Sequence, residues 1–329
     1  MPETSPNTTQ MKKINALQSR FIDAQAALKQ FIFGQDLVIE QVMTALLSGG
    51  HVLLVGLPGL AKTMLVTSLA SVTGLKSARI QSTPDLMPGD ILGIEVLDED
   101  SKGKRNFRFV KGPIFTNLLI ADEINRASPR TQSALLQAMQ EKHVTVAGKD
   151  HKIPDPFHVI ATQNPIEQDG TYPLPEAQLD RFFMEIHVDY PSREVEKQML
   201  ALTGQAKPKL TSVMSAKEFQ EAQALIHDIP VGEKVVDAIL ELIAQLRPNE
   251  TSHAQIKELV EWAPGPRGSQ ALLVGAKARA FLRGENAASI EDVIELAVPV
   301  LQHRMALSFA ARSENLSAKK LIEEICAGL

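Results

Sequence analysis

Short apolar runs in the first two thirds of the chain predict buried strands. Each run is four or five residues long, and helical spacing of apolar residues fills several of the gaps between them. The runs are His51–Val55, Ala78–Gln81, Leu118–Ala121, His158–Thr162 and Met184–Val188. Strands that alternate with helices are typical of a parallel sheet with helices on its faces. The pattern predicts an α/β domain, although runs this short are also compatible with buried helices.

Apolar residues at a spacing of three and four predict helices on both sides of this region. A stripe from Ile14 to Phe31 and the segment Leu37–Ser48 precede the first strand, and after Pro191 the pattern is helical throughout. The other expected helices are Lys62–Thr73, Pro129–Lys142 with Ser128 as N-cap, Val235–Leu246, Ser269–Leu282 with Gly284 after it, and two that open with the capping boxes Ser215/Glu218 and Ser289/Asp292. The chain therefore combines an α/β part with a helical part.

Two long excursions interrupt the α/β pattern. Thr83–Phe115 is rich in Gly and Asp and contains a polar turn at 98–103, and Val144–Phe157 is typical of a hairpin with Gly148 at its tip. Long excursions from a compact sheet domain are usually functional or disordered. The expected division is a disordered tail over 1–12, an α/β core over 13–192 with the excursions at about 83–115 and 144–157, a linker with a helix over 193–230, and a helical domain over 231–329.

Composition is that of an ordinary globular protein, with 44% hydrophobic and 22% charged residues in 329. Its 34 Lys and Arg against 39 Asp and Glu give a net charge of −5, so no global field attracts nucleic acid or an anionic membrane. The single cysteine, Cys326, excludes an internal disulfide and a Cys-based zinc site. The polar start and the absence of an apolar run near ~20 residues predict a cytoplasmic protein without membrane insertion.

The segment Gly-Leu-Pro-Gly-Leu-Ala-Lys-Thr at 56–63 predicts a phosphate-binding loop, because it joins a strand to a helix. Backbone N–H groups of such a loop surround the α and β phosphates, Lys62 reaches the β and γ phosphates, and the Thr63 hydroxyl ligates Mg²⁺. The residues expected to bind ATP are Gly56, Pro58, Gly59, Leu60, Ala61, Lys62, Thr63, Met64 and Asp122. Ala61 replaces the consensus glycine, so a simple glycine turn is the alternative.

Carboxylates and an amide follow two of the predicted strands. Asp122 and Glu123 come directly after one apolar run, and Asn164 follows another. Ligands of parallel sheets bind beyond the carboxyl ends of strands, so we expect Asp122 to hold Mg²⁺ through water, Glu123 to activate the attacking water, and Asn164 to position it. The alternatives are an acidic helix N-terminus for the two carboxylates and a turn before Pro165 for the amide.

Two arginines, Arg181 and Arg267, are further candidates for the site. Arg181 stands just ahead of the last predicted strand. Arg267 lies at the start of a predicted helix, where a cation opposes the helix dipole. A γ-phosphate would supply a reason for Arg267 at this place. The alternative for each is a solvated arginine on a loop, and Arg126 and Arg130 are weaker candidates of the same kind.

Other chemistries lack their residues in this sequence. The eight histidines have no paired spacing typical of metal ligands, no Gly-x-Ser-x-Gly segment occurs, and the 5% of aromatic residues are not interleaved with a basic stretch. A DNA motor is disfavoured by the net charge, although Lys102, Lys104, Arg105 and Arg108 could line a basic pore.

Five segments together resemble the MoxR family of AAA+ ATPases, and the resemblance extends over about 15–329. They are GLPGLAKT at 56–63, PIFTNLLIADEINRASPRTQSALLQAMQE at 113–141, ATQNP at 161–165, LPEAQLDRF at 174–182 and PGPRGSQALL at 264–273. MoxR-type loops often carry Ala at the position of Ala61. The resemblance implies a P-loop AAA+ core, with a parallel five-stranded sheet and flanking helices, followed by an all-helical lid. It also makes Thr83–Phe115 the helix-2 insert region and Val144–Phe157 the pre-sensor 1 hairpin.

The resemblance implies roles for the candidate residues. By this resemblance Lys62 is the Walker A lysine, and Asp122 and Glu123 are the Walker B pair. Asn164 corresponds to sensor 1 and Arg267 to sensor 2. Arg181 corresponds to an arginine finger that acts on a neighbouring subunit. It further implies Mg²⁺-dependent ATP hydrolysis, a hexameric ring, and chaperone-like remodelling of a protein client. Such proteins often have a partner with a von Willebrand factor A domain in complex maturation or metal-cofactor insertion.

Two other functions remain open from the sequence. A magnesium-chelatase-like motor subunit would carry the same nucleotide site, because its client is recognised by another chain. A nucleotide-gated binding module with little turnover is disfavoured by the joint presence of Glu123, Asn164, Arg181 and Arg267, since a scaffold needs no hydrolytic apparatus.

Overall fold

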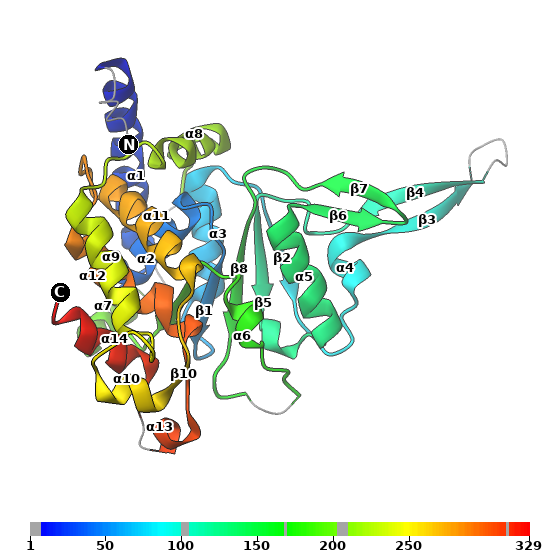
Figure 1. Cartoon of the computed structure of the whole chain (residues 1–329). Helices are drawn as coiled ribbons and strands as arrows, with labels where there is room; N and C mark the ends of the chain where they lie inside the picture. Colours follow the sequence, from blue (N-terminus) through cyan, green and yellow to red (C-terminus); the bar gives the residue numbers. More distant parts are fainter. Residues whose placement is uncertain (1–7, 100–104, 168–169, 203–209, 314–315) are drawn as a thin grey trace.

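A five-stranded parallel sheet forms the centre of the computed structural model (Figure 1). The structure describes residues 8–99, 105–167, 170–202, 210–313 and 316–329. The sheet has the order β2-β5-β8-β1-β9. Its strands are β1 (Val52–Gly56), β2 (Ser77–Gln81), β5 (Leu118–Asp122), β8 (His158–Gln163) and β9 (Met184–Val188). The five apolar runs are therefore strands, and the predicted parallel α/β core is confirmed.

Alternation along the strands sends side chains to two hydrophobic clusters, one on each face of the sheet. Leu54 and Ile120 enter the cluster that contains the first three helices, whereas Leu53 and Leu119 enter the opposite one. These helices are α1 (Thr8–Phe31), α2 (Asp36–Leu47) and α3 (Lys62–Thr73), and the opposite face is covered by α4 (Pro88–Leu92) and α5 (Pro129–Glu141). Because both faces are covered, the central strands β5, β8 and β1 are almost entirely buried.

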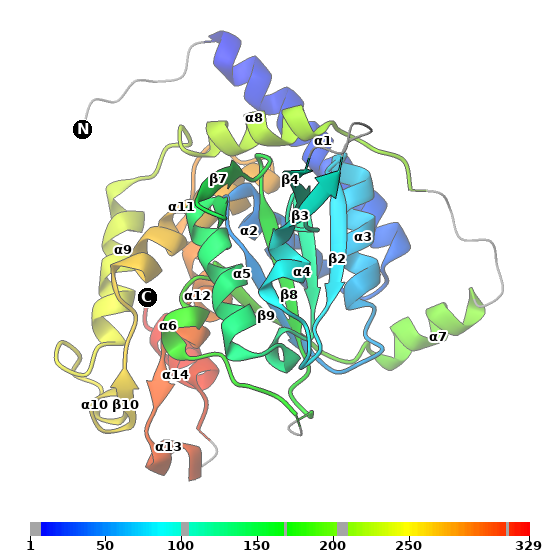
Figure 2. The ribbon, with the colours of Figure 1, turned by 90° about the vertical axis from the view of Figure 1, so that its right-hand side faces the viewer.

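Two antiparallel hairpins project from the side of the core that lies away from the C-terminal helices (Figures 1 and 2). One pairs β3 (Gly93–Glu99) with β4 (Arg105–Lys111), and the other pairs β6 (His143–Val146) with β7 (Lys149–Lys152). Both predicted hairpins are thus present. Of the polar turn predicted at 98–103, Asp98 and Glu99 belong to β3, while residues 100–103 and Lys104 lie outside the described part.

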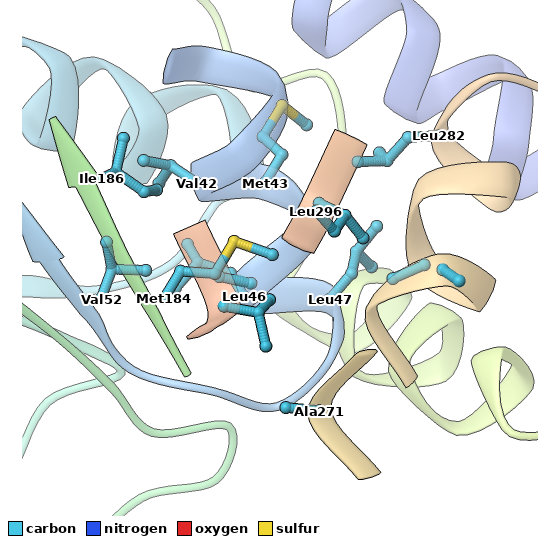
Figure 3. Close-up of a cluster of buried hydrophobic side chains, with 14 of the residues drawn as sticks. Val42, Met43, Leu46, Leu47, Val52, Met184, Ile186, Ala271, Leu282 and Leu296 are labelled. Carbon is cyan, nitrogen blue, oxygen red and sulfur yellow. The ribbon is translucent and has the colours of Figure 1, made fainter. Parts of the chain in front are cut away.

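The C-terminal third forms a helical lid, defined here as α9–α14, that packs on α2 and on the edge strand β9. Figure 3 shows Leu46 of α2, Met184 of β9 and Leu296 of α12 within one hydrophobic cluster. Between β9 and the lid lie α7 (Arg193–Ala201) and α8 (Ala216–Ile226). The elements of the lid are α9 (Glu233–Gln245), α10 (Ala254–Leu259), β10 (Val260–Trp262), α11 (Pro266–Leu282), α12 (Ile290–Leu301), the 3-10 turn Gln302–Arg304, β11 (Ala306–Leu307), α13 (Phe309–Ser313) and α14 (Ala318–Cys326). Two short elements of the core are the 3-10 turn Ile124–Arg126 and the helix α6 (Glu176–Leu179). A continuous apolar cluster therefore joins the lid to the core.

The N-terminal helix starts earlier than the sequence pattern suggested. Helix α1 begins at Thr8, inside the stretch 1–12 expected as a tail, while residues 1–7 lie outside the described part. Its residues Phe21 and Leu28 are fully buried. The helix is therefore part of the core packing.

Two buried histidines lie at the amino ends of β1 and β8. His51 accepts a hydrogen bond at Nδ1 from the backbone N–H of Val159, 2.9 Å away, and Nδ1 of His158 lies 2.8 Å from the backbone oxygen of Gly50. Burial is the main cause that lowers the pKa of His51 to about 3 and that of His158 to about 4. Both rings are therefore neutral in the folded chain at neutral pH.

We expect acid to destabilise the protein through this pair. Because the pKa values lie below the ordinary 6.5, the unfolded chain binds more protons between pH 6.5 and about 4, and stability falls as the pH drops through that window. Each of the two histidines should lower the free energy of unfolding by about 1.5 kcal/mol between pH 6.5 and pH 5. Urea unfolding at pH 6.5 and pH 5 measures this loss of stability. In His158→Gln the loss should be smaller by the contribution of one histidine. An equal pH dependence in His158→Gln would contradict this expectation.

Candidate functional site

A cavity of about 350 Å³ lies at the carboxyl edge of the sheet, where β1 passes into α3. It is lined by Pro58, Gly59, Leu60, Ala61, Lys62, Thr63, Met64, Arg79, Gln81, Asp122, Glu123, Thr162 and Asn164. Three candidate groups from separate parts of the sequence, the loop, the carboxylate pair and the amide, therefore face one space.

The loop backbone adopts the left-handed conformation at two positions. Gly59 has a φ of +84°, and Ala61 has a φ of +57° and stands as the N-cap of α3. Residues other than glycine are strained in the left-handed conformation. The backbone at Ala61 therefore favours the glycine that the consensus has at this position. The N-terminus of α3 opens at the cavity, and its dipole and backbone N–H groups favour an anion there.

Lys62 points its ammonium group back at the loop and donates a hydrogen bond to the backbone oxygen of Gly56. Partial burial lowers the pKa of Lys62, and the charges of Asp122 and Glu123 act in the opposite direction. A cation in this position, beside a helix N-terminus, matches the charge of a bound phosphate chain.

Asp122 is the most enclosed carboxylate of the site, with 5% of the residue exposed. Its Oδ2 accepts from Nε of Arg79 at 2.6 Å and from the Thr63 hydroxyl at 3.4 Å, while Oδ1 accepts from the Thr162 hydroxyl at 3.2 Å. The carboxylate is therefore fixed on one side by β8 and faces the phosphate loop on the other.

Glu123 directly follows β5 in a left-handed conformation, with a φ of +54°. Its backbone N–H donates to Thr162, and its Oε2 accepts from Gln81 at 3.0 Å and from Arg126 at 3.2 Å. Strained backbone of this kind clusters at functional sites. Asn164, which is 6% exposed, lines the same cavity and accepts at Oδ1 from the N–H of Ile166.

Comparison with known proteins gives the family. Residues 51–184 match the family described as "ATPase family associated with various cellular activities (AAA)", and residues 253–325 match "AAA lid domain". The chain is 40% identical over 299 residues to Chaperone MoxR1 of Mycobacterium tuberculosis. The aligned region covers 91% of this chain and 78% of that relative. The chain belongs to the MoxR family of AAA+ ATPases. Protein MoxR of Paracoccus denitrificans is 30% identical over 313 residues, covering 90% of this chain and 91% of that protein.

A solved structure shares the fold of this chain. A protein from Cytophaga hutchinsonii, assigned as an ATPase, superposes with a TM-score of 0.90 at 35% identity over 98% of this chain and 97% of its own. Within the described part of the chain, none of the helices has the length and apolar character needed to cross a membrane.

The donors of this MoxR site suit magnesium, the ion that AAA+ ATPases use. The Thr63 hydroxyl and the Asp122 carboxylate lie 3.4 Å apart, and oxygen ligands of this kind fit Mg²⁺ accompanied by water. The residues present therefore fit the ion, with Thr63 and Asp122 as the groups that would hold it.

The two candidate arginines line a different cavity, of about 340 Å³, which shares no lining residue with the first. Arg267, at the start of α11, donates to Asp180 at 3.1 Å, and Arg181 donates to the backbone oxygen of Leu136 at 3.0 Å. Arg304, whose side chain is 4% exposed, donates to the same Asp180 at 2.9 Å. The structure therefore keeps Arg181 and Arg267 together but apart from Lys62.

Three residues of the first cavity were missed by sequence reasoning: Arg79, Gln81 and Thr162. Arg79 and Gln81 alternate with apolar residues on β2, which lies beside β5 in the sheet. The signal for them was a charged and a polar side chain with period two, on the exposed side of a strand at the edge of the sheet. Arg130 lines neither of the two cavities, whereas Arg126 contacts Glu123.

Proposed function

We propose that this MoxR family chain is a Mg²⁺-dependent ATPase that works as a ring, in which each subunit completes the active site of its neighbour. The observation that carries the proposal is the separation of the two cavities. One holds the phosphate loop with Asp122 and Glu123, and the other holds Arg181 and Arg267. A site that contains the base but not the arginines needs a second copy to supply them.

The chain's own residues divide the work of hydrolysis. The loop and Lys62 bind and orient the phosphates. Thr63 and Asp122 would hold the ion, which would neutralise charge on the phosphates. Glu123 accepts the proton of the attacking water, and Asn164 positions that water by its amide. Arg181 and Arg267 of the adjacent subunit stabilise the charge that develops on the γ-phosphate.

The client of such a ring is a protein. This part of the proposal is supported by the relative named as a chaperone and by the family resemblance, which also suggests a hexamer and a partner with a von Willebrand factor A domain. Complex maturation and metal-cofactor insertion are the processes in which MoxR-type proteins take part by that resemblance. The hairpins β3–β4 and β6–β7, which extend from the core, are the surfaces we propose for contact with the client (Figure 1).

A dilution series tests the proposal. We expect ATP turnover per subunit to rise steeply with protein concentration in Mg²⁺ and to track ring formation measured by light scattering, because the arginines arrive only with assembly. Lys62→Ala should weaken nucleotide binding at least about tenfold, the scale of one lost charge-assisted hydrogen bond. Turnover per subunit that stays constant from monomer to ring would refute shared sites, and binding untouched by Lys62→Ala would refute the nucleotide site.

A further inference from the structure

Arg79 forms the shortest of the ion pairs at the nucleotide cavity. Its Nε lies 2.6 Å from Oδ2 of Asp122, and its Nη2 lies 3.4 Å from Oε1 of Gln81. The oxygen that it contacts is the one that also faces the Thr63 hydroxyl. Arg79 therefore occupies the side of the carboxylate on which Thr63 and Asp122 would hold magnesium.

The two partners of this ion pair differ in their freedom to move. The side chain of Arg79 is 54% exposed, whereas that of Asp122 is 7% exposed and is fixed by Thr162 at its other oxygen. A buried carboxylate without a partner is costly, so a cation at Asp122 stabilises the subunit when no metal is bound. If one group must yield, it is the arginine, because its long side chain can reach water.

Magnesium and the guanidinium compete for the same place. Both are cations that the charge of Asp122 attracts, whether the ion would be held directly or through a water, and their like charges would repel each other at this place. Arg79 also supports the amide of Gln81, whose Nε2 donates to Glu123, so its position is linked to that of the proposed base. An ion held at Asp122 would therefore be opposed by Arg79 in its present position.

We propose that Arg79 is a built-in counter-ion that holds Asp122 until magnesium-bound nucleotide displaces it, and thereby sets the magnesium concentration at which nucleotide is retained. The proposal rests on the nucleotide site proposed above. It assigns to Arg79 a positioning role through Asp122 and not a contact with the phosphates, and this distinction is what an experiment must resolve.

Magnesium titration of nucleotide binding provides the test. The fluorescence anisotropy of an N-methylanthraniloyl derivative of ATP is measured with the full chain while Mg²⁺ is raised from excess chelator. We expect Arg79→Gln to lower the Mg²⁺ concentration for half-maximal binding by about tenfold, the scale of one charge-assisted hydrogen bond that no longer competes. Binding in chelator alone should stay within about threefold of the parent chain, because Arg79 does not touch the phosphates in this proposal.

Two further variants make the result specific. Arg79→Lys keeps a cation without the planar fork and should give a smaller shift, and it carries the test if Arg79→Gln does not fold. Arg283→Gln removes a partly exposed arginine that pairs with Glu285 at 3.2 Å and lines neither cavity, and it should leave the titration unchanged.

The outcomes separate the two proposals. An unchanged magnesium midpoint in both Arg79 variants would overturn the counter-ion role, and so would a loss of binding in chelator, which identifies a phosphate contact. If the parent chain itself retains no nucleotide at saturating Mg²⁺, the proposed function fails, whatever Arg79 does.

Discussion

Glu123→Gln should abolish turnover while nucleotide stays bound. The amide keeps the size of the side chain but cannot accept a proton from water, and a positioned general base contributes about 10²–10⁴ in rate. The partners of this carboxylate are Gln81 and Arg126, not the phosphate loop, so affinity for ATP should remain within about twofold of the parent chain. Steady-state phosphate release and equilibrium binding of labelled ATP measure the two effects on the same preparation.

A neighbouring carboxylate supplies the matched control. Glu167 lies 4.0 Å from the same Arg126 but does not line the cavity, so Glu167→Gln removes a similar charge without touching the proposed base. Its turnover should stay near that of the parent chain. If Glu123→Gln turned over ATP at a comparable rate, the base would have to be another residue.

Elements that depend on neighbours in sequence were predictable. The helix Lys62–Thr73 has the bounds that its pattern indicated, and the capping boxes at Ser215 and Ser289 are both formed. A capping box needs only residues three positions apart, and a buried strand shows itself as an apolar run. Such features are fixed by local chemistry, so one sequence is enough to find them.

Contacts between distant segments were not predictable in this way. Arg79 and Asp122 are separated by 43 positions and meet only because β2 lies beside β5 in the sheet. Asp180 joins Arg267 across 87 positions and Arg304 across 124. Spacing carries no information on which strands become neighbours or where a lid helix packs, so the pairing of these charges required the structure.

The place of Asp180 explains how the second cavity is organised. Arg304 donates to Asp180 and to the backbone oxygens of Phe182 and Phe183, so the segment around Arg181 is fastened to the lid. Arg267 pairs with the other oxygen of the same carboxylate. The proposed finger and the proposed sensor 2 arginine are therefore presented as one rigid unit, which fits an action on a neighbouring subunit.

Arg181→Ala should reduce turnover by about 10³–10⁵, the contribution of an arginine finger, and the loss should be partly reversed by subunits that carry a different defect. In a mixed ring, Arg181→Ala subunits keep Lys62 and Lys62→Ala subunits keep Arg181. An intact nucleotide site therefore lies beside an intact arginine wherever a Lys62→Ala subunit is the neighbour that supplies the arginine to an Arg181→Ala subunit. In a random equal mixture each site needs its own Lys62 and its neighbour's Arg181, so about one quarter of sites regain activity.

Phosphate release from such mixtures, scanned over the mixing ratio, decides whether the arginine acts between subunits. The matched control combines Lys62→Ala with Glu123→Gln, two defects of the same cavity, which cannot complement each other in any arrangement. We expect no recovery there and a maximum near equal proportions in the Arg181 mixture. If the Arg181 mixture also stays inactive at every ratio while rings form normally, Arg181 serves its own subunit, and the separation of the two cavities must close by a movement of the lid.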